Sequence, residues 1–216
     1  MTSISVIIPQ YGQQNLTTRL IGQLRQFEPS ETELIVVDDG SPEGTVSDKL
    51  SDEKIRFIQQ THRGVTATWN TGAKEATGNV LVFLNNDVNV TGPFLTPLIE
   101  PLFHSDPAMT GPQLRTERLL PITLSPKSPR TLLEGWCVAV GRETFDRLQS
   151  FDERFQMYFS DTDFQWRLLA SHSQAKLIAV PDLPLQHLGH VSTRNHPKRH
   201  QLHAADCQKF LEKWKA

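Results

Sequence analysis

Apolar residues along the chain gather in short runs, and these runs alternate with segments that have helical periodicity. The runs at residues 34–37 and 80–84 contain no polar residue, as in strands that are buried on both faces of a sheet. Between residues 15 and 27 the apolar positions instead recur every three or four residues, which predicts an amphipathic helix. Strands and helices that alternate in this way indicate an α/β fold with a mostly parallel, Rossmann-like sheet flanked by helices.

The same pattern predicts the remaining elements. The first part of the chain has expected strands at residues 4–8, 33–37, 55–58 and 80–84 and helices at residues 15–27, 46–50 and 66–76. We expect Pro9 to end the first strand, because proline cannot donate to a strand ladder. The second part has expected helices at residues 94–104, 143–148, 162–170 and 202–214, extended segments within 109–124 and at 135–140 and 175–180, and an irregular loop at 125–130.

The chain changes character after residue 90. Eight of its fourteen prolines lie between Gly92 and Arg130, and no repeat or low-complexity tract separates two folding units. We therefore expect a single domain over residues 1–216, with one half at residues 1–90 and a more elaborate half at residues 91–216.

Polar residues follow both buried strands directly. Asn85, Asn86 and Asp87 come after residues 80–84, and Asp38 and Asp39 come after residues 34–37. Ligands of open α/β sheets bind at this carboxyl edge. Asp87, with Asn85 on the same side of the chain, could hold a divalent cation on a diphosphate. Asp38 or Asp39 could accept hydrogen bonds from a ribose or a base. The alternative for both segments is a simple turn, since Asn, Asp and Gly are common turn residues.

Two more carboxylates stand at the expected start of a helix. Asp161 and Asp163 follow the aromatic pair Tyr158 and Phe159. One of them could cap the helix, because an aspartate there binds unpaired backbone amides. The other could act as a general base that is aimed into a partly apolar site.

Five of the eight histidines lie between His187 and His203. A neutral imidazole at His187 could complete a metal site that is otherwise built from carboxylates. For His196, His200 and His203 the rival interpretation is a zinc site, but no cysteine pattern supports it. A solvated loop is the simpler interpretation of these three residues. Three cations in the same segment could clamp phosphates: Arg194, Lys198 and Arg199.

Composition narrows the class of protein. A formal net charge of -2 over 216 residues argues against nucleic acid as a partner. Cys137 and Cys207 form no CxxC pattern, which favours a reducing compartment. The sequence begins without signal-peptide features and contains no apolar run long enough to span a membrane. We expect a cytoplasmic protein, with peripheral attachment to the inner face of a membrane as a further option.

Seven segments occur in an order that resembles one known family. They lie at residues 6–11, 36–41, 70–78, 83–87, 135–155, 160–167 and 187–192. Residues 83–87 match its DxD motif, residues 160–167 its ED-x-D…R segment, and residues 187–192 its H-x-x-G-x-S segment. The chain thereby resembles the inverting glycosyltransferases of family 2, which have the GT-A fold.

The resemblance implies a role for each motif residue. It implies a nucleotide-sugar-binding first half, an acceptor-binding and catalytic second half, Mg²⁺ or Mn²⁺ as cofactor, and a carbohydrate or lipid-linked acceptor, typically in the synthesis of cell-surface polysaccharide or glycoconjugates. Asp161 would be the catalytic base. The donor would bind at Pro9, Tyr11, Asp38, Asp39, Asn70, Asn86 and Asp87. The acceptor would bind at Trp136, Ser160 and Asp163. The metal would be held by Asp87 and His187, with Asn85 as a further candidate.

Two positions depart from the family pattern. Asn85 replaces the first aspartate of the DxD motif, and Ser160 replaces the glutamate that usually precedes the base. These changes keep open a nucleotide-sugar-binding module with degraded catalysis. A nucleotidyltransferase is a weaker alternative, because residues 10–14 supply no Gly-rich phosphate loop, and no GxGxxG follows the first strand to support a dehydrogenase.

Overall fold

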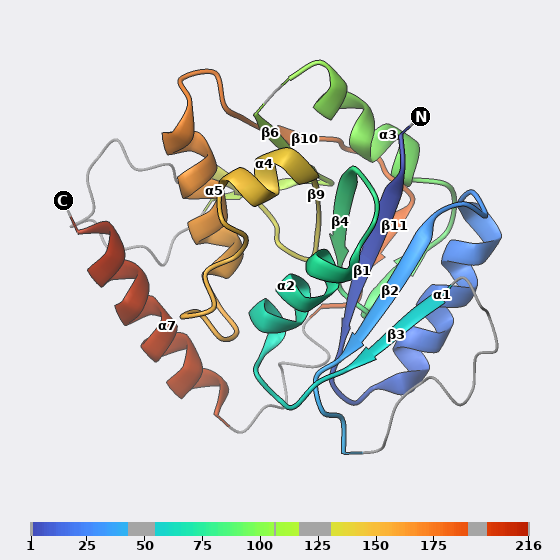
Figure 1. The fold of residues 1–216 in the computed structure, drawn as a ribbon, viewed down its shortest axis with the longest axis horizontal. Helices are drawn as coiled ribbons and strands as arrows, with labels where there is room; N and C mark the ends of the chain where they lie inside the picture. Colours follow the sequence, from blue (N-terminus) through green and yellow to red (C-terminus); the bar gives the residue numbers. More distant parts are fainter. Residues whose placement is uncertain (1, 43–54, 106, 117–130, 190–197, 216) are drawn as a thin grey trace.

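The computed structural model describes residues 2–42, 55–105, 107–116, 131–189 and 198–215. Its centre is a seven-stranded sheet with the order β10-β6-β9-β4-β1-β2-β3 (Figure 1). The strands of this sheet are β1 (Ile4–Gln10), β2 (Glu33–Asp38), β3 (Ile55–Gln59), β4 (Val80–Leu84), β6 (Ala108–Gly111), β9 (Cys137–Gly141) and β10 (Lys176–Ala179). Its strands come from both halves of the sequence, and the expected α/β class is confirmed.

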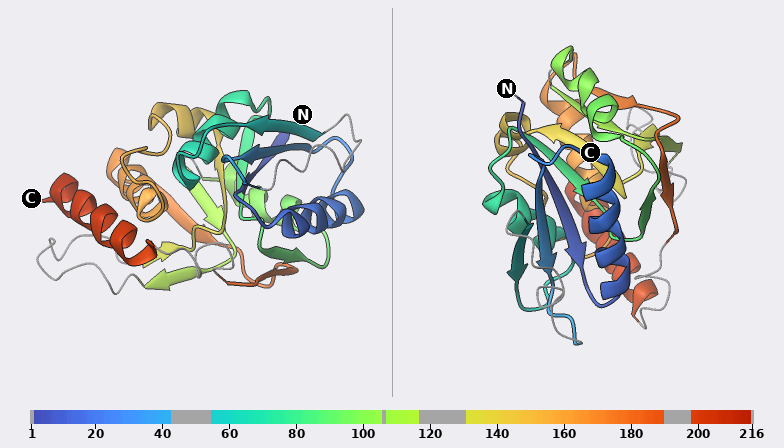
Figure 2. Two further views of the ribbon diagram at one scale, coloured as in Figure 1. Left: turned by 90° about the horizontal axis from the view of Figure 1, so that it is seen from below. Right: turned by 90° about the vertical axis from the view of Figure 1, so that its right-hand side faces the viewer.

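Helices cover both faces of this sheet, as Figure 2 shows. The helices are α1 (Gln14–Phe27), α2 (Val65–Glu75), α3 (Leu95–Ile99), the 3-10 helix η2 (Glu100–Phe103), α4 (Arg142–Arg147), α5 (Ser160–Ser171) and α7 (Arg199–Trp214). The alternation of side chains along each strand divides the core into two layers. Val6 and Ile8 of β1 pack toward α1 and α3, whereas Ile7 packs toward α2, α4 and α5.

β9 is the one strand of the seven-stranded sheet that runs against its neighbours. It pairs antiparallel with β4 and with β6, whereas the other pairs in this sheet are parallel. The start of β9 therefore lies beside the end of β4, and Asn85 N donates to Trp136 O over 2.8 Å. This reversal brings a residue of the second half to the carboxyl edge of the first half's strands.

Two short ladders extend this edge. β5 (Val88–Val90) pairs with β11 (Leu185–His187), and β7 (Leu114–Thr116) pairs with β8 (Thr131–Leu133). Of these, β5, β8 and β11 are absent from the sequence-based prediction, because runs of three residues carry no readable periodicity.

The first strand does not stop at Pro9, contrary to the expectation from sequence. β1 continues to Gln10, with Pro9 opposite Val37. Alternate residues of a strand direct their backbone groups to opposite neighbours. Gln10 faces β2, since its carbonyl accepts from Asp39 N, so Pro9 faces the β4 side, where pairing already ends at Ile7. The missing N–H therefore costs no ladder bond.

The other expected elements are mostly confirmed, and two are wrong. The helix expected at residues 94–104 is divided into α3 and η2, since Pro101 removes a donor and its ring clashes with the preceding turn. The loop favoured for His200 and His203 is instead the first part of α7, which begins at Arg199, before the helix expected at residues 202–214. The helix expected at 46–50, the loop at 125–130, the end of the segment at 109–124, His196 and Arg194 lie outside the described residues.

The described helices include none that is both long and apolar enough to cross a lipid bilayer.

Candidate active site

A pocket of about 500 Å³ opens at the carboxyl edge of the central sheet. All but three of the residues predicted from sequence to form a site lie in its wall. They are Pro9, Tyr11, Asp39, Asn85, Asn86, Asp87, Trp136, Ser160, Asp161 and His187. The sheet explains this convergence, because β1, β2 and β4 are parallel and end at one edge, and the antiparallel β9 begins there.

The β2 end of the pocket is organised by Asp39. Its Oδ1 accepts hydrogen bonds from Gln60 Nε2 at 2.7 Å and from Arg63 N at 2.9 Å. Its Oδ2 accepts from Gly64 N at 2.8 Å and contacts His62 Nδ1 at 2.9 Å. The carboxylate is only 4% exposed, so these contacts use its acceptor capacity. Asp39 shapes the segment at residues 60–64, which contributes two pocket residues, His62 and Gly64.

Two rings form a shelf at this end. The ring centroids of Tyr11 and His62 lie 4.4 Å apart with a tilt of 32°. Tyr11 is 40% exposed, although it carries a large apolar ring. An exposed aromatic face in a pocket can stack with a flat heterocycle such as a nucleobase.

Asp87 and His187 meet in the wall of the pocket. Asp87 Oδ1 lies 3.2 Å from His187 Nε2, because β11 pairs with β5 and brings His187 opposite Val88. The His187 ring also stacks on Trp136, with centroids 5.1 Å apart and planes 14° apart. Within the described residues no group of three or more His, Cys, Asp or Glu side chains could hold a metal ion. Among the described residues, Asp87 and His187 therefore form a pair of potential ligands at this point.

Asp161 also lines the pocket and is the second residue of α5. Its carboxylate is 15% exposed, and its Oδ2 lies 3.3 Å from Arg115 Nη2. The preceding Phe159 has a left-handed backbone, with a φ angle of 66°. That conformation is uncommon for a residue with a bulky side chain. It turns the chain sharply into the helix.

Three residues predicted from sequence do not line the pocket. Asp38 accepts from the backbone N–H and the hydroxyl of Ser41, as in the turn that was its alternative reading. Asn70 holds both backbone groups of Phe151 through its side-chain amide. Asp163 is completely buried among cations, as described next, so its carboxylate faces the interior rather than an acceptor.

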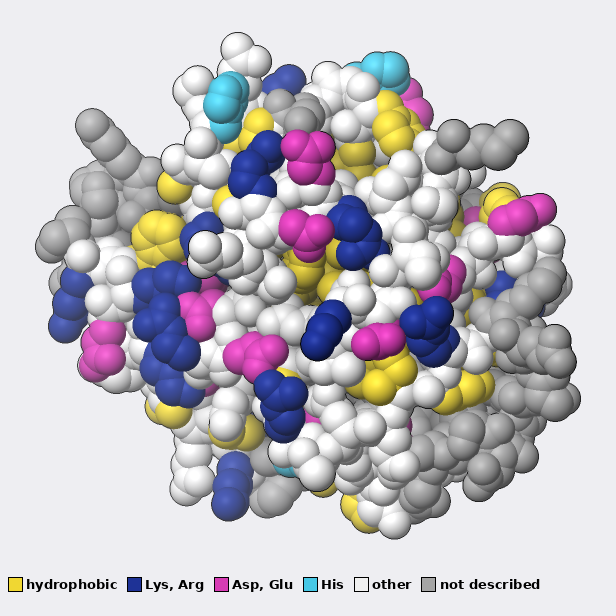
Figure 3. All heavy atoms as spheres, in the orientation of Figure 1, with side chains coloured by type: hydrophobic (Ala, Val, Ile, Leu, Met, Phe, Trp, Pro, Cys, Tyr) yellow, Lys and Arg dark blue, Asp and Glu magenta, His cyan; other side chains and the backbone are white. Residues whose placement is uncertain are grey.

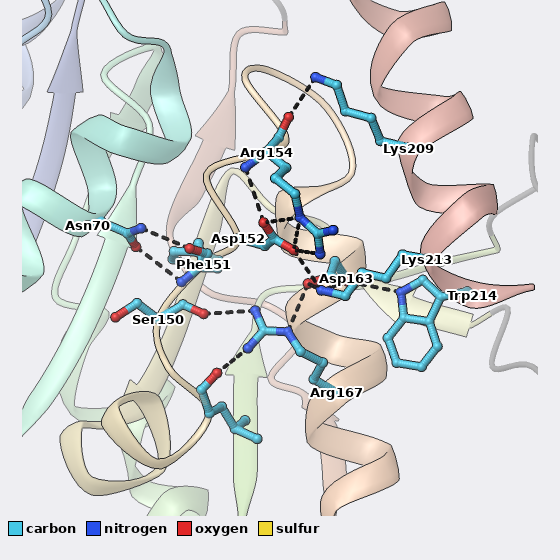
Figure 4. A network of polar contacts seen from close by, with 11 residues as sticks. Asn70, Ser150, Phe151, Asp152, Arg154, Asp163, Arg167, Lys209, Lys213 and Trp214 are labelled. Atoms are coloured by element: carbon cyan, nitrogen blue, oxygen red, sulfur yellow. Dashed lines mark hydrogen bonds and ion pairs between the residues drawn. The ribbon is translucent and has the colours of Figure 1, made fainter.

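The last described helix, α7, is fastened to the loop that precedes α5 (Figure 4). Asp163 contacts Arg167 Nε at 2.8 Å and Lys213 Nζ at 2.7 Å, and accepts from the Trp214 indole N–H at 2.9 Å. Lys213 Nζ also lies 2.8 Å from Asp152 Oδ2. Figure 3 shows Lys and Arg side chains gathered over α7 on this face. Buried charges of this kind need partners, and each here has one.

A further buried carboxylate, that of Asp206 on α7, fixes the pocket wall. Asp206 Oδ2 accepts hydrogen bonds from three successive backbone N–H groups, those of Gln156, Met157 and Tyr158, at 3.1, 3.0 and 3.1 Å. Asp206 is fully buried. Met157 and Tyr158 line the pocket. The position of this wall is therefore set by a helix that lies about 50 residues later in the chain.

Several pocket residues were not assigned a donor, acceptor or catalytic role from sequence. They include His62, Arg115, Glu134, Tyr158 and His203. Glu134 Oε2 accepts from Trp136 Nε1 at 2.6 Å and so orients that ring. Burial raises the pKa of the Tyr158 hydroxyl. The readable signal for His203 was its spacing from Asp206 and Phe210, which places all three on one helical face.

Comparison with known proteins agrees with this architecture. The Glycosyl transferase family 2 model matches residues 5–165. Polypeptide N-acetylgalactosaminyltransferase 8 of Drosophila melanogaster is 26% identical over 230 residues, which cover 87% of this chain and 38% of that relative. The chain thus spans about two fifths of the length of this curated relative.

Two solved structures have the same fold. The structure of GalNAc-T7 with UDP, GalNAc and Mn²⁺ has a TM-score of 0.69 and 18% identity, over 87% of this chain and 44% of that one. The mannosyltransferase PcManGT of Pyrobaculum calidifontis, in complex with GDP-Man and Mn²⁺, has a TM-score of 0.68 and 20% identity, over 98% of this chain and 64% of that one. At these identities the likeness shows the GT-A fold and does not by itself give an activity. The family match over residues 5–165 supplies the remaining step: the chain belongs to glycosyl transferase family 2.

Proposed function

We propose that this protein is an inverting glycosyltransferase that moves a sugar from a nucleotide-diphosphate sugar to an acceptor hydroxyl. The observation that carries the proposal is the convergence of Asp87, His187 and Asp161 on one pocket, beside a shelf that suits a base. Membership of family 2 supports the reaction class. The two solved relatives were bound to UDP or to GDP-Man, which supports a nucleotide sugar as donor.

The nucleotide would bind at the β2 end. Its base would stack on the shelf made by Tyr11 and His62, with Pro9 beside it. Asp39 would act mainly by holding the segment at residues 60–64 in place, since its oxygens already accept from that segment. The diphosphate would then reach Asp87.

A divalent cation fits between Asp87 and His187. A carboxylate oxygen and an imidazole nitrogen 3.2 Å apart can both ligate one Mn²⁺ or Mg²⁺, and such ions commonly take their other ligands from substrate phosphates and water. When bound, the ion would offset the charge that develops on the leaving diphosphate. Asn85 also lines this part of the pocket and could reach the ion through water.

Asp161 would be the base. The acceptor hydroxyl gives its proton to this carboxylate while its oxygen attacks the anomeric carbon, and the bond from that carbon to the diphosphate oxygen breaks. Attack from the face opposite the diphosphate inverts the anomeric centre. The acceptor side is bounded by Trp136, Tyr158 and Phe159. Such an aromatic wall suits the apolar faces of a sugar ring, and we assign a carbohydrate or lipid-linked acceptor, with cell-surface polysaccharide or glycoconjugate as the destination.

The test is the variant Asp161→Asn. It should bind UDP with Mn²⁺ as tightly as the wild type and lose transfer by a factor on the order of 10² or more, because the amide cannot accept the proton. Release of nucleoside diphosphate from UDP-GalNAc, UDP-glucose, GDP-mannose and dTDP-rhamnose, with and without sugar acceptors, measures turnover. Asp146→Asn is the matched control, since Asp146 is exposed on α4. Unchanged turnover in Asp161→Asn would remove this residue from the mechanism.

A binding module without catalysis is the second candidate. Asn85 and Ser160, which depart from the family pattern, both line the pocket and favour it. In that case UDP and Mn²⁺ would raise the melting temperature of the wild type, while no sugar nucleotide would be cleaved with any acceptor.

A further inference from the structure

Arg115 contacts Asp161 from a separate element. It lies on β7 opposite Leu132 of β8, and its Nη2 is 3.3 Å from Asp161 Oδ2 and 3.4 Å from Thr162 Oγ1. The guanidinium is 37% exposed and the carboxylate 15% exposed. Arg115 thus ties the β7–β8 ladder to the first turn of α5, at the residue that the proposed function uses as base.

Gly135 lies against the same oxygen, Asp161 Oδ2, from the other side. A Cβ atom added at Gly135 would lie 2.4 Å from Asp161 Oδ2 and 2.7 Å from its Cγ. A real Cβ atom would clash at these distances. Asp161 Oδ2 therefore occupies the space beside the Gly135 backbone that a side chain would need. Oδ2 is therefore contacted by the Arg115 guanidinium on one side and by the Gly135 backbone on the other.

The second oxygen is in a different situation. Within the described residues, Asp161 Oδ1 receives no hydrogen bond, although Asp161 lines the pocket. The two oxygens of one carboxylate therefore differ in access. One is occupied by protein, and the other remains for a ligand.

We infer that Arg115 is a positioning residue for Asp161, which fixes Oδ2 and leaves Oδ1 as the oxygen that receives the acceptor proton. This inference rests on the proposed transfer reaction. The proton moves from the acceptor hydroxyl to Oδ1, the hydroxyl oxygen bonds to the anomeric carbon, and the diphosphate leaves with the electron pair of the broken bond. The guanidinium, which is always charged, holds the plane of the carboxylate through this contact.

The contact between Arg115 and Asp161 also connects residues that have no evident relation in the sequence. Arg115, Gly135 and Asp161 lie on three different segments, and none of them is needed by the cap of α5, which has no side-chain hydrogen bond at Phe159. Their shared feature is the carboxylate of Asp161. A purely structural ion pair on the surface would contribute little to stability and would not require a glycine on its other side.

The kinetic test compares Arg115→Met with Arg115→Lys. In Arg115→Met, kcat for transfer should fall about tenfold or more, because the base is no longer held in line. The donor KM and the binding of UDP with Mn²⁺ should stay within about twofold of the wild type, since the described contacts of Arg115 are with Asp161 and Thr162 on α5. Arg115→Lys should recover part of kcat, because the charge returns without the planar fork. Arg56→Met is the matched control, since Arg56 pairs with Glu33 and Glu75 on an exposed part of β3.

Two results would overturn the inference. One is an Arg115→Met variant with wild-type kcat. The other is an Arg115→Met variant in which UDP binding weakens as much as kcat falls, which would make Arg115 a donor ligand.

A double-mutant cycle separates this inference from the proposed function, since it needs no turnover. Thermal unfolding of Arg115→Met, Asp161→Asn and the double variant should be non-additive if the pair exists in solution. Additive shifts would exclude the pair, even in an active enzyme. Coupling in a protein that cleaves no sugar nucleotide would leave the pair intact and reject transfer, and with it the role of Oδ1.

Discussion

Gly135 shows how a single position controls the candidate base. Only a hydrogen atom fits between its Cα and the carboxylate of Asp161. The neighbouring Glu134 and Trp136 are joined by a hydrogen bond of 2.6 Å, so three successive residues each act on a different part of the pocket. A glycine is needed at position 135 because the Asp161 carboxylate occupies the space of a side chain.

Gly135→Ala should therefore lower transfer sharply while donor binding is retained. The new methyl group must displace Asp161, whereas Tyr11, Asp39 and Asp87 are untouched. The comparison of kcat with the binding of UDP and Mn²⁺ tests this. Gly22→Ala is the control, because a Cβ there meets nothing within 4 Å on the exposed side of α1. That variant should keep full activity and gain about 0.5–1 kcal/mol of stability from helix propensity.

The pair formed by Asp87 and His187 leads to a second residue-scale prediction. Mn²⁺ alone should raise the melting temperature only slightly, because the described residues provide two ligands at this point. Mn²⁺ with UDP should raise it markedly more than UDP alone, because phosphate oxygens complete the shell.

Asp87→Asn should abolish this synergy between metal and nucleotide. Asp182→Asn, at an exposed turn, should leave it unchanged. Strong stabilisation by Mn²⁺ without nucleotide would contradict the two-ligand site.

Much of the pocket could be predicted at the residue scale, because several of its residues directly follow a strand or begin a helix. Asp39, Asp87 and Asp161 follow a buried strand or begin a helix, so their place at the sheet edge can be read from the sequence alone. Arg115 and His203 reach the pocket through tertiary packing of β7 and α7. Asp163 looked like a site residue because it is close to Asp161 in sequence, but helical rotation turns it into the interior.

Among the elements, α7 contributes to the site although it lies near the end of the sequence. The family model ends at residue 165, before this helix begins. His203 nevertheless lines the pocket, with its ring 5.0 Å from that of Tyr158. Phe210 packs between Phe155, Phe159 and Trp166 in a small separate core. The helix thus joins the pocket wall to its own apolar cluster.

The buried carboxylate of Asp206 should be essential to this attachment. Asp206→Ala leaves three backbone N–H groups without an acceptor and should cost about 3 kcal/mol or more in the free energy of unfolding. Urea denaturation measures this cost. Glu212→Ala on the exposed side of the same helix should stay within about 0.5 kcal/mol of the wild type. Equal effects of both variants would show that the loop does not depend on this carboxylate.

The helices of ten or more residues and the fully buried strands were predicted within a few positions of their observed ends. Helices α1 and α2 and strands β2 and β4 have strong periodicity or long apolar runs, and their observed bounds follow the pattern. The region rich in proline was less readable, because Pro101 interrupts helical hydrogen bonding between α3 and η2. The three-residue strands exist only through their partners, and such pairing is not encoded locally.

For the whole molecule, the charges around α7 make stability sensitive to acid. Burial alone would raise the pKa of Asp152, but hydrogen bonds from Arg154 and Lys213, together with the charge of Lys213, hold that pKa well below its usual range. A carboxyl whose pKa is lower in the folded state stabilises the fold fully above its unfolded pKa, near 3.8. This stabilisation is lost as the pH falls below that value.

The variant Asp152→Asn should therefore be less stable than the wild type at neutral pH, and the difference should shrink as the pH falls below about 4. Urea unfolding of both proteins from pH 3 to pH 7 measures the difference. A difference that stays constant down to pH 3 would mean that the ion pair with Lys213 does not form in solution.

The reversed strand β9 has a consequence for any attempt to divide the protein. It separates β4 from β6 in the main sheet, so a cut near residue 90 would leave β4 with an open edge on one fragment and β9 with an open edge on the other. Such edges recruit other chains and aggregate. Neither fragment should be soluble when expressed by itself, and the two should complement each other only when they are produced together and can restore the β4–β9 ladder.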